Sequence, residues 1–263
     1  MPSKEVAGGS LDLNYVRARL PERRIDWFGS VNSTMTIAAQ LARDGCAGGT
    51  IVGAEGQLAG IGRHGHVWHS EVGAGLYLSM VLRLPTHQAM PARGMPAAML
   101  ALGLAVQEAI AQVTQLAPDL RWPNDVLVNG KKCAGILAQV EGEAIIAGIG
   151  INVRQAMFPA AISDVATSLR IEGAPDVRRE DLLIALVEAV DRSCKILTEQ
   201  GPRAIFDMFT RSSTYASGRR VRVDQKDQII EGVTCGLDES GFLIVREDNG
   251  KETTILAGGV RPA

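Results

Sequence analysis

The feature of this sequence that most constrains its fold is a tight turn at Asn129-Gly130, which lies between two runs that read as strands. Both residues tolerate the positive φ angles that a two-residue hairpin turn requires. The turn belongs to residues 121–137, which read RWPNDVLVNGKKCAGIL, so the returning strand starts at Lys131-Lys132 and runs into small residues. We therefore expect Lys132 to be held on a rigid strand, beside backbone that a ligand can approach closely. The alternative from this stretch alone is a surface hairpin with two solvated lysines.

Composition limits the kind of protein that carries this hairpin. With 263 residues and 46% hydrophobic content, the chain is long enough for one main core and a smaller appendage. Its net charge of −2 gives no global positive field for nucleic acid or an anionic membrane, so neither is expected as a partner. The sequence shows no signal peptide and no uninterrupted apolar stretch that could span a bilayer. Four scattered cysteines indicate a reduced, cytoplasmic protein without a disulfide framework.

Hydrophobic periodicity predicts strands and helices on both sides of the hairpin. Strands are expected over residues 24–28, 51–55, 75–84 and 144–151, and helices over residues 11–20, 36–43, 96–115, 178–198 and 202–209. The mixture of long helices with antiparallel-type hairpins predicts an α+β fold for the main domain. Gly148 and Gly150 alternate along one strand and are expected to leave a slot on one face, with Asn152 at its end. Ser33 and Thr34 precede a helix, where a hydroxyl can cap the helix or meet a polar ligand.

A glycine-rich segment, GQLAGIGRHGH, follows the second of these strands. It fits neither the P-loop nor the dinucleotide-binding pattern, but it offers backbone N–H groups and the cationic fork of Arg63, which suits phosphate. Trp68 follows and can cover a base. Three histidines, His64, His66 and His69, lie in the same stretch, but their spacing is not that of a standard zinc site. We therefore expect solvated or phosphate-facing imidazoles rather than metal ligands.

The composition changes near Ser217. From Gly218 onward the chain consists of short alternating segments separated by turn signals such as Asp248-Asn249-Gly250. This pattern predicts a small β-barrel of about five strands, which is too small to be stable as an independent domain. We therefore divide the chain into a main domain, residues 1–217, and a C-terminal domain, residues 218–263.

Taken together, these residues resemble the biotin–protein ligase family, in its short form without a DNA-binding domain. The matching segments are Ser33-Thr34, Ala54-Glu55-Gly56-Gln57, Gly60, Gly62-Arg63, Trp68-His69-Ser70, Trp122-Pro123-Asn124-Asp125, Lys132, Ala134-Gly135-Ile136-Leu137, residues 148–152, Ala166-Thr167-Ser168-Leu169 and, in the C-terminal domain, Glu231-Gly232, Leu237-Asp238 and Gly258-Gly259-Val260. They follow the family's order over most of residues 24–263, so the joint signal is more specific than any single motif. The resemblance implies a mixed sheet flanked by helices, similar to class II aminoacyl-tRNA synthetases, and a C-terminal SH3-like domain. The residues before Arg24 are too few for a DNA-binding domain, which disfavours a transcriptional repressor.

The resemblance also implies an activity and its residues. Members of the family join biotin to ATP, giving biotinyl-5'-AMP and pyrophosphate, and transfer biotin to a lysine of the biotin carboxyl carrier protein. By their match to the family's motifs, Lys132 and Arg63 are the expected catalytic residues. The residues implied to bind biotin are Ser33, Thr34, Gln57, Gly60, Arg63, Lys132 and Gly135, and those implied to bind ATP or the adenylate are Arg63, Trp68, Asn124, Lys132 and Asn152. Mg²⁺ is expected to bridge the phosphates without protein side-chain ligands, and a homodimer is left open.

The sequence departs from the family pattern in the glycine-rich loop. The usual Gly-Arg-Gly-Arg-Arg-Gly-Arg is replaced here by Gly-Ile-Gly-Arg-His-Gly-His, and Met35 stands where Asn is usual. The loss of loop cations predicts a leakier adenylate, or one whose release depends on pH, because His64 and His66 can gain charge below neutral pH.

Two alternatives to an active ligase are therefore kept: a degenerate biotin- or adenylate-binding protein without turnover, and a lipoate–protein ligase of the same fold. The presence of Lys132, Arg63 and Asn124 favours the active ligase. Gln57 and the Trp-Pro-Asn-Asp block resemble the biotin branch better than the lipoate branch.

Overall fold

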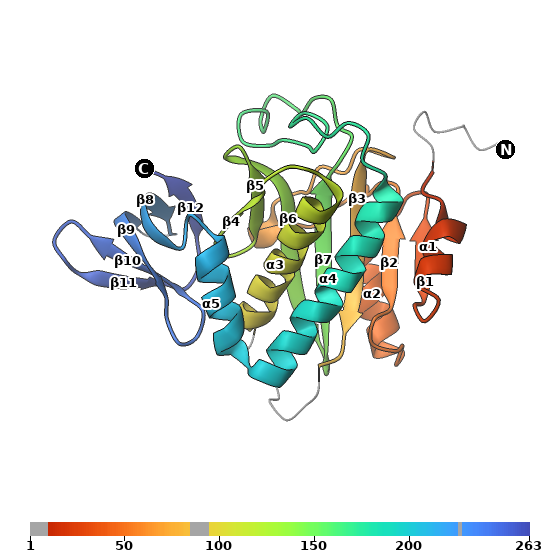
Figure 1. Cartoon of the computed structure of the whole chain (residues 1–263), viewed down its shortest axis with the longest axis horizontal. Helices are drawn as coiled ribbons and strands as arrows, with labels where there is room; N and C mark the ends of the chain where they lie inside the picture. The colour runs from red at the N-terminus through yellow and green to blue at the C-terminus, as the bar shows by residue number, and fades with distance from the viewer. Residues whose placement is uncertain (1–9, 85–94, 226–227) are drawn as a thin grey trace.

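The computed structural model describes residues 10–84, 95–225 and 228–263 of the chain (Figure 1). Its helices are α1 (Leu13–Arg19), α2 (Thr34–Arg43), α3 (Met95–Val113), α4 (Arg179–Gln200) and α5 (Pro202–Ser212), with a short 3-10 helix η1 (Arg63–Gly65). The strands of the main domain are β1 (Ile25–Phe28), β2 (Ile51–Ala54), β3 (Gly75–Leu82), β4 (Asp119–Arg121), β5 (Asp125–Val128), β6 (Lys131–Glu141) and β7 (Ala144–Asn152). The C-terminal strands are β8 (Ser217–Asp224), β9 (Ile229–Leu237), β10 (Leu243–Glu247), β11 (Glu252–Ile255) and β12 (Gly259–Pro262). The elements expected from periodicity are present close to their predicted bounds.

The main domain is built on one mixed sheet with strand order β1-β2-β3-β7-β6-β5-β4. The β1–β2 pair is parallel, and the other neighbouring pairs are antiparallel. Helices α3, α4 and α5 pack together over β4, β5 and β6, while α2 packs on β2, β3 and β7 (Figure 1). The predicted α+β fold, a mixed sheet flanked by helices, is confirmed.

The two faces of the sheet are covered differently, because successive side chains of a strand point to opposite sides. On β3, Leu76 and Leu78 join the main core beneath α3 and α4. On β7, Ile146 joins a smaller cluster beneath α2. Gly148 and Gly150 follow Ile146 with a period of two, so they lie on the same face as α2. This face therefore lacks side chains where those glycines lie.

Helix α3 is the core helix of the fold. By length and composition it is apolar enough to cross a membrane, contrary to the expectation from the sequence that no such stretch exists. In the structure it packs against α4, α5 and the sheet, and 61% of its most apolar stretch is buried.

The C-terminal strands form a second sheet, antiparallel throughout, in the order β11-β10-β9-β8-β12. Within the described residues β11 and β12 remain its edges, so the pairings give an open sheet rather than the predicted closed barrel. The sheet does not need to enclose a core alone, because it is anchored to the main domain around Gly241. The Trp122 Nε1–H donates to Gly241 O at 3.0 Å, and the Phe206 ring of α5 packs on the same glycine. The division of the chain at Ser217 stays a prediction.

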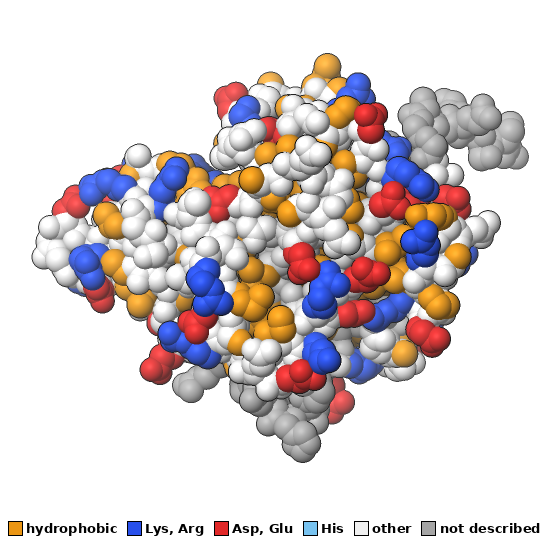
Figure 2. All heavy atoms as spheres, in the orientation of Figure 1, with side chains coloured by type: hydrophobic (Ala, Val, Ile, Leu, Met, Phe, Trp, Pro, Cys, Tyr) orange, Lys and Arg blue, Asp and Glu red, His pale blue; other side chains and the backbone are white. Residues whose placement is uncertain are grey.

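The surface carries both signs of charge. On the face shown in Figure 2, Lys and Arg side chains are interspersed with Asp and Glu over both domains. This mixture agrees with the net charge of −2.

Candidate functional site

The hairpin places Lys132 at the centre of the candidate site. Asn129 (φ 50°) and Gly130 (φ 79°) both have positive φ, as the two-residue turn requires. On the other side of β6, the Lys132 N–H donates to Val165 O at 2.8 Å, and the Thr167 N–H donates to Lys132 O at 2.9 Å. Both backbone polar groups of Lys132 are therefore bonded to residues 165–167, and the prediction that Lys132 lies on a strand just after the turn is confirmed.

Two cations share one half-buried carboxylate, that of Asp125, beside the hairpin. The Lys132 ammonium lies 2.5 Å from one oxygen of Asp125, and the Arg121 guanidinium lies 2.7 Å from the other. Burial raises the pKa of Asp125, but the attraction of Lys132 and Arg121 outweighs burial and holds this pKa below its ordinary value. Asp125 therefore stays ionised near neutral pH and holds the ammonium in one place.

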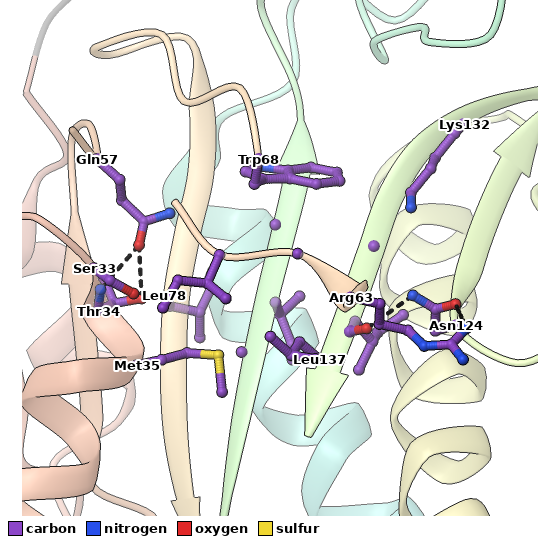
Figure 3. Close-up of a pocket in the computed structure, with 17 residues that line it drawn as sticks. Ser33, Thr34, Met35, Gln57, Arg63, Trp68, Leu78, Asn124, Lys132 and Leu137 are labelled. Carbon is purple, nitrogen blue, oxygen red and sulfur yellow. Dashed lines mark hydrogen bonds between the residues drawn. The ribbon is translucent and has the colours of Figure 1, made fainter. Parts of the chain in front are cut away.

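A third cation, Arg63, comes from the glycine-rich loop. The Arg63 Nη1–H donates to Asn124 Oδ1 at 2.9 Å, and Asn124 Nδ2 donates to Ile136 O at 3.1 Å (Figure 3). Burial lowers the pKa of Arg63 and nearby Asp125 opposes this shift, but an arginine keeps its charge in proteins. One directed hydrogen bond thus joins the loop to the Trp-Pro-Asn-Asp block.

The floor of the site is the glycine face of the sheet, and Trp68 lies on it. Gly135 and Gly150 are register partners on β6 and β7. A Cβ added at Gly135 would lie 2.8 Å from the Trp68 ring, and one at Gly150 would lie 2.5 Å from it. The Lys132 ammonium is 5.4 Å from a ring centroid of Trp68, within cation–π range.

The inner end of this floor is covered by Met35. A Cβ added at Gly148 would lie 2.7 Å from Met35 Sδ. In Figure 3 the Met35 side chain points into the pocket, and Leu137 packs against the same small cluster as Met35. The slot predicted at Gly148 and Gly150 is confirmed, but side chains of the protein itself occupy much of it.

Two cavities meet at Lys132. The inner pocket measures about 50 Å³ and is lined by Ser33, Thr34, Met35, Gln57, Ile61, Gly62, Arg63, Trp68, Leu78, Asn124, Lys132, Gly135, Ile136, Leu137, Gly148, Ile149 and Gly150 (Figure 3). The outer cleft measures about 1070 Å³ and reaches from Asn152 and residues 158, 162 and 165–166 to the C-terminal sheet at residues 224–225, 228, 253–254 and 256–261. Arg63, Trp68, Asn124 and Lys132 line both cavities.

The inner pocket has one polar end. The Thr34 N–H donates to Gln57 Oε1 at 2.9 Å, and Gln57 Nε2 donates to Ser70 Oγ at 3.2 Å. Ser33 holds the N-cap position of α2, but its hydroxyl makes no capping bond there. Among the described residues, neither Ser33 Oγ nor Trp68 Nε1 has a hydrogen-bond partner, although both atoms are buried. Buried polar groups are normally paired, so these two atoms are available to a ligand.

Gly60 acts on the loop rather than on the pocket. The Trp68 N–H donates to Gly60 O at 2.9 Å, and a Cβ at Gly60 would lie 2.7 Å from Trp68 O and 3.1 Å from Gln57 Nε2. Gly60 lines neither cavity. The Gly62 N–H, expected to be exposed, donates to His66 O at 2.7 Å.

The histidines of this loop are only partly placed. His66 and His69 line the outer cleft, and the side chain of His64 lies outside what the structure describes. The expected pH-dependent retention of the adenylate stays a prediction. No group of three or more His, Cys, Asp or Glu side chains within residues 10–84, 95–225 and 228–263 is arranged to hold a metal ion.

Sequence reasoning missed the roles of Asp125 and Met35 in the two cavities. Asp125 belongs to the Trp-Pro-Asn-Asp block, but its bond to Lys132 was not expected, since an Asp before a hairpin also fits a simple turn. Met35 was noted only as a departure from the family pattern, and its place over Gly148 was not. A buried helical position directly after a Ser-Thr pair is the signal that could have identified it.

Known proteins are similar to this chain over most of its length. The biotin/lipoate A/B protein ligase family matches residues 27–155, and the biotin protein ligase C terminal domain matches residues 216–260. A biotin–[acetyl-CoA-carboxylase] ligase of Mycobacterium tuberculosis is 33% identical over 235 residues, which cover 88% of this chain and 84% of that protein. The chain belongs to the biotin protein ligase family. The bifunctional ligase/repressor BirA of Bacillus subtilis is 31% identical to this ligase over 227 residues, 84% of this chain and 68% of BirA.

Solved structures of the family have the same architecture as this biotin protein ligase. The biotin protein ligase from Aquifex aeolicus in complex with biotin and ATP has a TM-score of 0.80 and 28% identity, covering 91% of this chain and 99% of that one. The protein is therefore an enzyme of the ligase class.

Proposed function

We propose that this ligase joins biotin to ATP, giving biotinyl-5'-AMP and pyrophosphate, and then transfers the biotinyl group to a lysine of a biotin carboxyl carrier protein. The observation that carries the proposal is that Lys132 and Arg63 line both the inner pocket and the outer cleft. A carboxylate reaching out of the pocket and a phosphate reaching in from the cleft would meet between these two cations.

The first step needs such cations because two anions must approach each other. Like unit charges about 4 Å apart repel by about 4 kcal/mol at an effective dielectric constant of about 20. An oxygen of the biotin carboxylate attacks the α-phosphorus of ATP, and the bond from that phosphorus to the pyrophosphate oxygen breaks. Lys132 and Arg63 stabilise the negative charge on the phosphoryl oxygens in the transition state. Asp125 keeps Lys132 in place for this role.

We assign the ureido ring of biotin to the polar end of the inner pocket. Ser33, Thr34 and Gln57 offer hydrogen bonds there, and a ligand without matching groups would leave them unpaired. A pocket of about 50 Å³ holds only a few water-sized volumes. Entry of a bicyclic ring therefore requires Trp68 or Met35 to move off the glycines beneath it.

We assign the nucleotide to the outer cleft. Trp68 would pack on adenine, and Asn124 and Asn152 would face the adenylate. The oxygens of Asp125 are already engaged by two cations, so Mg²⁺ fits best as an ion held mainly by the phosphate oxygens, where it neutralises their charge.

The second step is transfer to the carrier protein. The amine of the acceptor lysine attacks the acyl carbon of the mixed anhydride, the bond to AMP breaks, and an amide forms as the amine loses a proton. The outer cleft, about 1070 Å³ and open between the main domain and the C-terminal sheet, has room for a lysine chain beside the adenylate. We also propose a cytoplasmic location, because the four cysteines are free thiols, as a reducing compartment keeps them.

The test compares two neighbouring lysines on the same hairpin. The protein is mixed with biotin, MgATP and a carrier domain, and biotin attached to the carrier is measured together with biotin-dependent exchange of pyrophosphate into ATP. We expect Lys132→Gln to reduce both by at least about 100-fold, the range for loss of one preorganised group. The matched control is Lys131→Gln, because Lys131 is exposed and only approaches Ser163 O, at 3.4 Å; it should keep parental activity.

Three results would contradict the proposal. Pyrophosphate exchange without transfer to several carrier domains indicates an adenylate-binding protein that does not complete the reaction. Biotin binding without exchange indicates a degenerate binder. Exchange that depends on lipoate or octanoate instead of biotin indicates the lipoate branch of the family.

A further inference from the structure

A chain of buried hydrogen bonds lies behind Asn152, which lines the outer cleft. Gln155 is 1% exposed and donates from Nε2 to Tyr77 Oη at 2.9 Å; the same nitrogen lies 3.4 Å from Asn152 Oδ1. Tyr77 is fully buried, and its hydroxyl donates to Glu71 O at 3.1 Å. Asn152 Nδ2 donates to Thr167 O at 2.9 Å. The sequence analysis identified neither Gln155 nor Tyr77 as part of the site.

The backbone carbonyls of Glu71 and Thr167 determine the orientation of two side-chain amides, those of Gln155 and Asn152. A carbonyl oxygen only accepts, so the Tyr77 hydroxyl must give its single hydrogen to Glu71 O. The Tyr77 oxygen can then only accept, and Gln155 must present its NH₂ group to it. In the same way Thr167 O requires the NH₂ group of Asn152, which turns Asn152 Oδ1 toward Gln155. Each amide orientation follows from a partner that cannot be reversed, which removes the usual ambiguity between amide N and O.

We propose that Gln155 is a positioning residue, which acts through Asn152 on the binding of ATP. This inference rests on the proposed function, since it takes Asn152 as a contact of the nucleotide. With its oxygen held by Gln155 and one amide hydrogen held by Thr167 O, Asn152 presents its other hydrogen and its free lone pair in one fixed arrangement. Without the Gln155 side chain, the Asn152 amide keeps only its hydrogen bond to Thr167 O and can rotate about it.

The surroundings of Gln155 support positioning rather than packing. Its main chain is fixed by Ser168, whose hydroxyl donates to Gln155 O at 2.7 Å. Its side-chain oxygen Oε1 is buried without a hydrogen-bond partner among the described residues. An unpaired buried acceptor lowers stability, so a role in packing alone would be met better by an apolar side chain of similar length.

The experiment replaces Gln155 by Met, which keeps the length and removes both hydrogen bonds. Dissociation constants for biotin and for a non-hydrolysable ATP analogue with Mg²⁺ are measured by calorimetry. For Gln155→Met we expect the dissociation constant of the analogue to rise about fivefold to tenfold, the effect of about one hydrogen bond, while that of biotin stays within twofold. Gln155→Glu should weaken binding of the analogue more than Gln155→Met does, because a carboxylate would face Asn152 Oδ1.

Two further variants separate positioning from a general effect. In an Asn152→Ala background, Gln155→Met should have no further effect on the analogue, because the group that it positions is gone. The matched control is Gln107→Met: Gln107 also donates twice from Nε2, to Pro118 O and Ser212 O, but lines neither cavity. Gln107→Met should leave both dissociation constants unchanged. Thermal melts check folding, and Gln155→Leu replaces Gln155→Met if the latter unfolds.

The inference is overturned if Gln155→Met raises the dissociation constant of the analogue by the same factor with and without Asn152. It is also overturned if Gln155→Met raises the dissociation constants of biotin and of the analogue by the same factor, or changes neither of them. The proposed function fails by a different result, namely a parent protein that binds biotin but shows no biotin-dependent pyrophosphate exchange. A parent that exchanges pyrophosphate while Gln155→Met retains parental affinity overturns the positioning role alone.

Discussion

The ammonium of Lys132 and the carboxylate of Asp125 lie 2.5 Å apart across the β5–β6 hairpin, and an irregularity in strand pairing brings Lys132 to the face where this contact lies. The register is Val126 with Ala134 but Leu127 with Lys132, so one extra residue lies on β6. A shift of one residue turns a side chain to the other face of a sheet. Lys132 therefore shares a face with Gly135, where an added Cβ would lie 3.0 Å from the Lys132 side chain.

We expect Asp125→Asn to slow adenylate formation by about tenfold or more. The substitution keeps the shape of the side chain but removes the charge that holds Lys132, so the ammonium is less well placed for the phosphoryl transfer. The measurement is biotin-dependent pyrophosphate exchange at saturating substrates. A parental rate in the variant would show that Asp125 does not position Lys132.

The same carboxylate makes stability depend on acidity. The pKa of Asp125 in the folded protein lies below its ordinary value of about 4. A lowered pKa adds stability that is fully present above the ordinary value and is lost as pH falls through the folded value. We therefore expect the free energy of unfolding to decrease below about pH 4 and to do so less in Asp125→Asn. Urea denaturation as a function of pH measures this, and parallel curves for the two proteins would contradict it.

We expect Gly150→Ala to displace Trp68 and to weaken ATP binding by about tenfold or more. The added Cβ would lie 2.5 Å from the indole, a distance that the ring can only relieve by moving. Gly29→Ala is the control, because a Cβ there meets no atom within 4 Å. Calorimetric titration with an ATP analogue gives the affinities. Equal affinities in Gly150→Ala and Gly29→Ala would show that the position of Trp68 is unimportant.

Glu55→Gln should lower the free energy of unfolding by about 3–5 kcal/mol, the usual result of removing one partner of a buried ion pair. Glu55 lies 2.7 Å from Arg179, and their side chains are 7% and 1% exposed. Glu108→Gln is the matched control, because its pair with Arg192 is half exposed and should contribute less than about 1 kcal/mol. Urea denaturation measures both. Equal losses would mean that burial does not set the strength of the Glu55 pair.

The elements of the main domain could be predicted from the sequence because their signals are local. The turn at Asn129-Gly130 follows from the φ angles that those two residues tolerate, and the strand and helix bounds follow from hydrophobic period. The slot at Gly148 and Gly150 follows from the period of two along a strand.

The contacts within the site could not be predicted in the same way, because they depend on pairing between distant segments. The extra residue on β6 that lets Lys132 reach Asp125 has no signature in the sequence. The position of Trp68 over Gly135 depends on how the loop closes onto the sheet. A closed C-terminal barrel was expected from the short alternating segments and their turn signals. The contacts of Trp122 and Phe206 with Gly241, between segments far apart in the sequence, show why an open sheet suffices.

The hydrogen bond from the Trp122 indole to Gly241 O ties the appended sheet to the strand end that carries Asn124 and Asp125. Only one residue separates Trp122 from Asn124 along the chain. Under the proposed function, a tilt of the appended sheet on binding of the carrier protein would be passed through Trp122 and Pro123 to Asn124, which we assign to the adenylate. The Trp122–Gly241 contact therefore offers a direct route by which the proposed acceptor, once bound, would affect the proposed adenylate site.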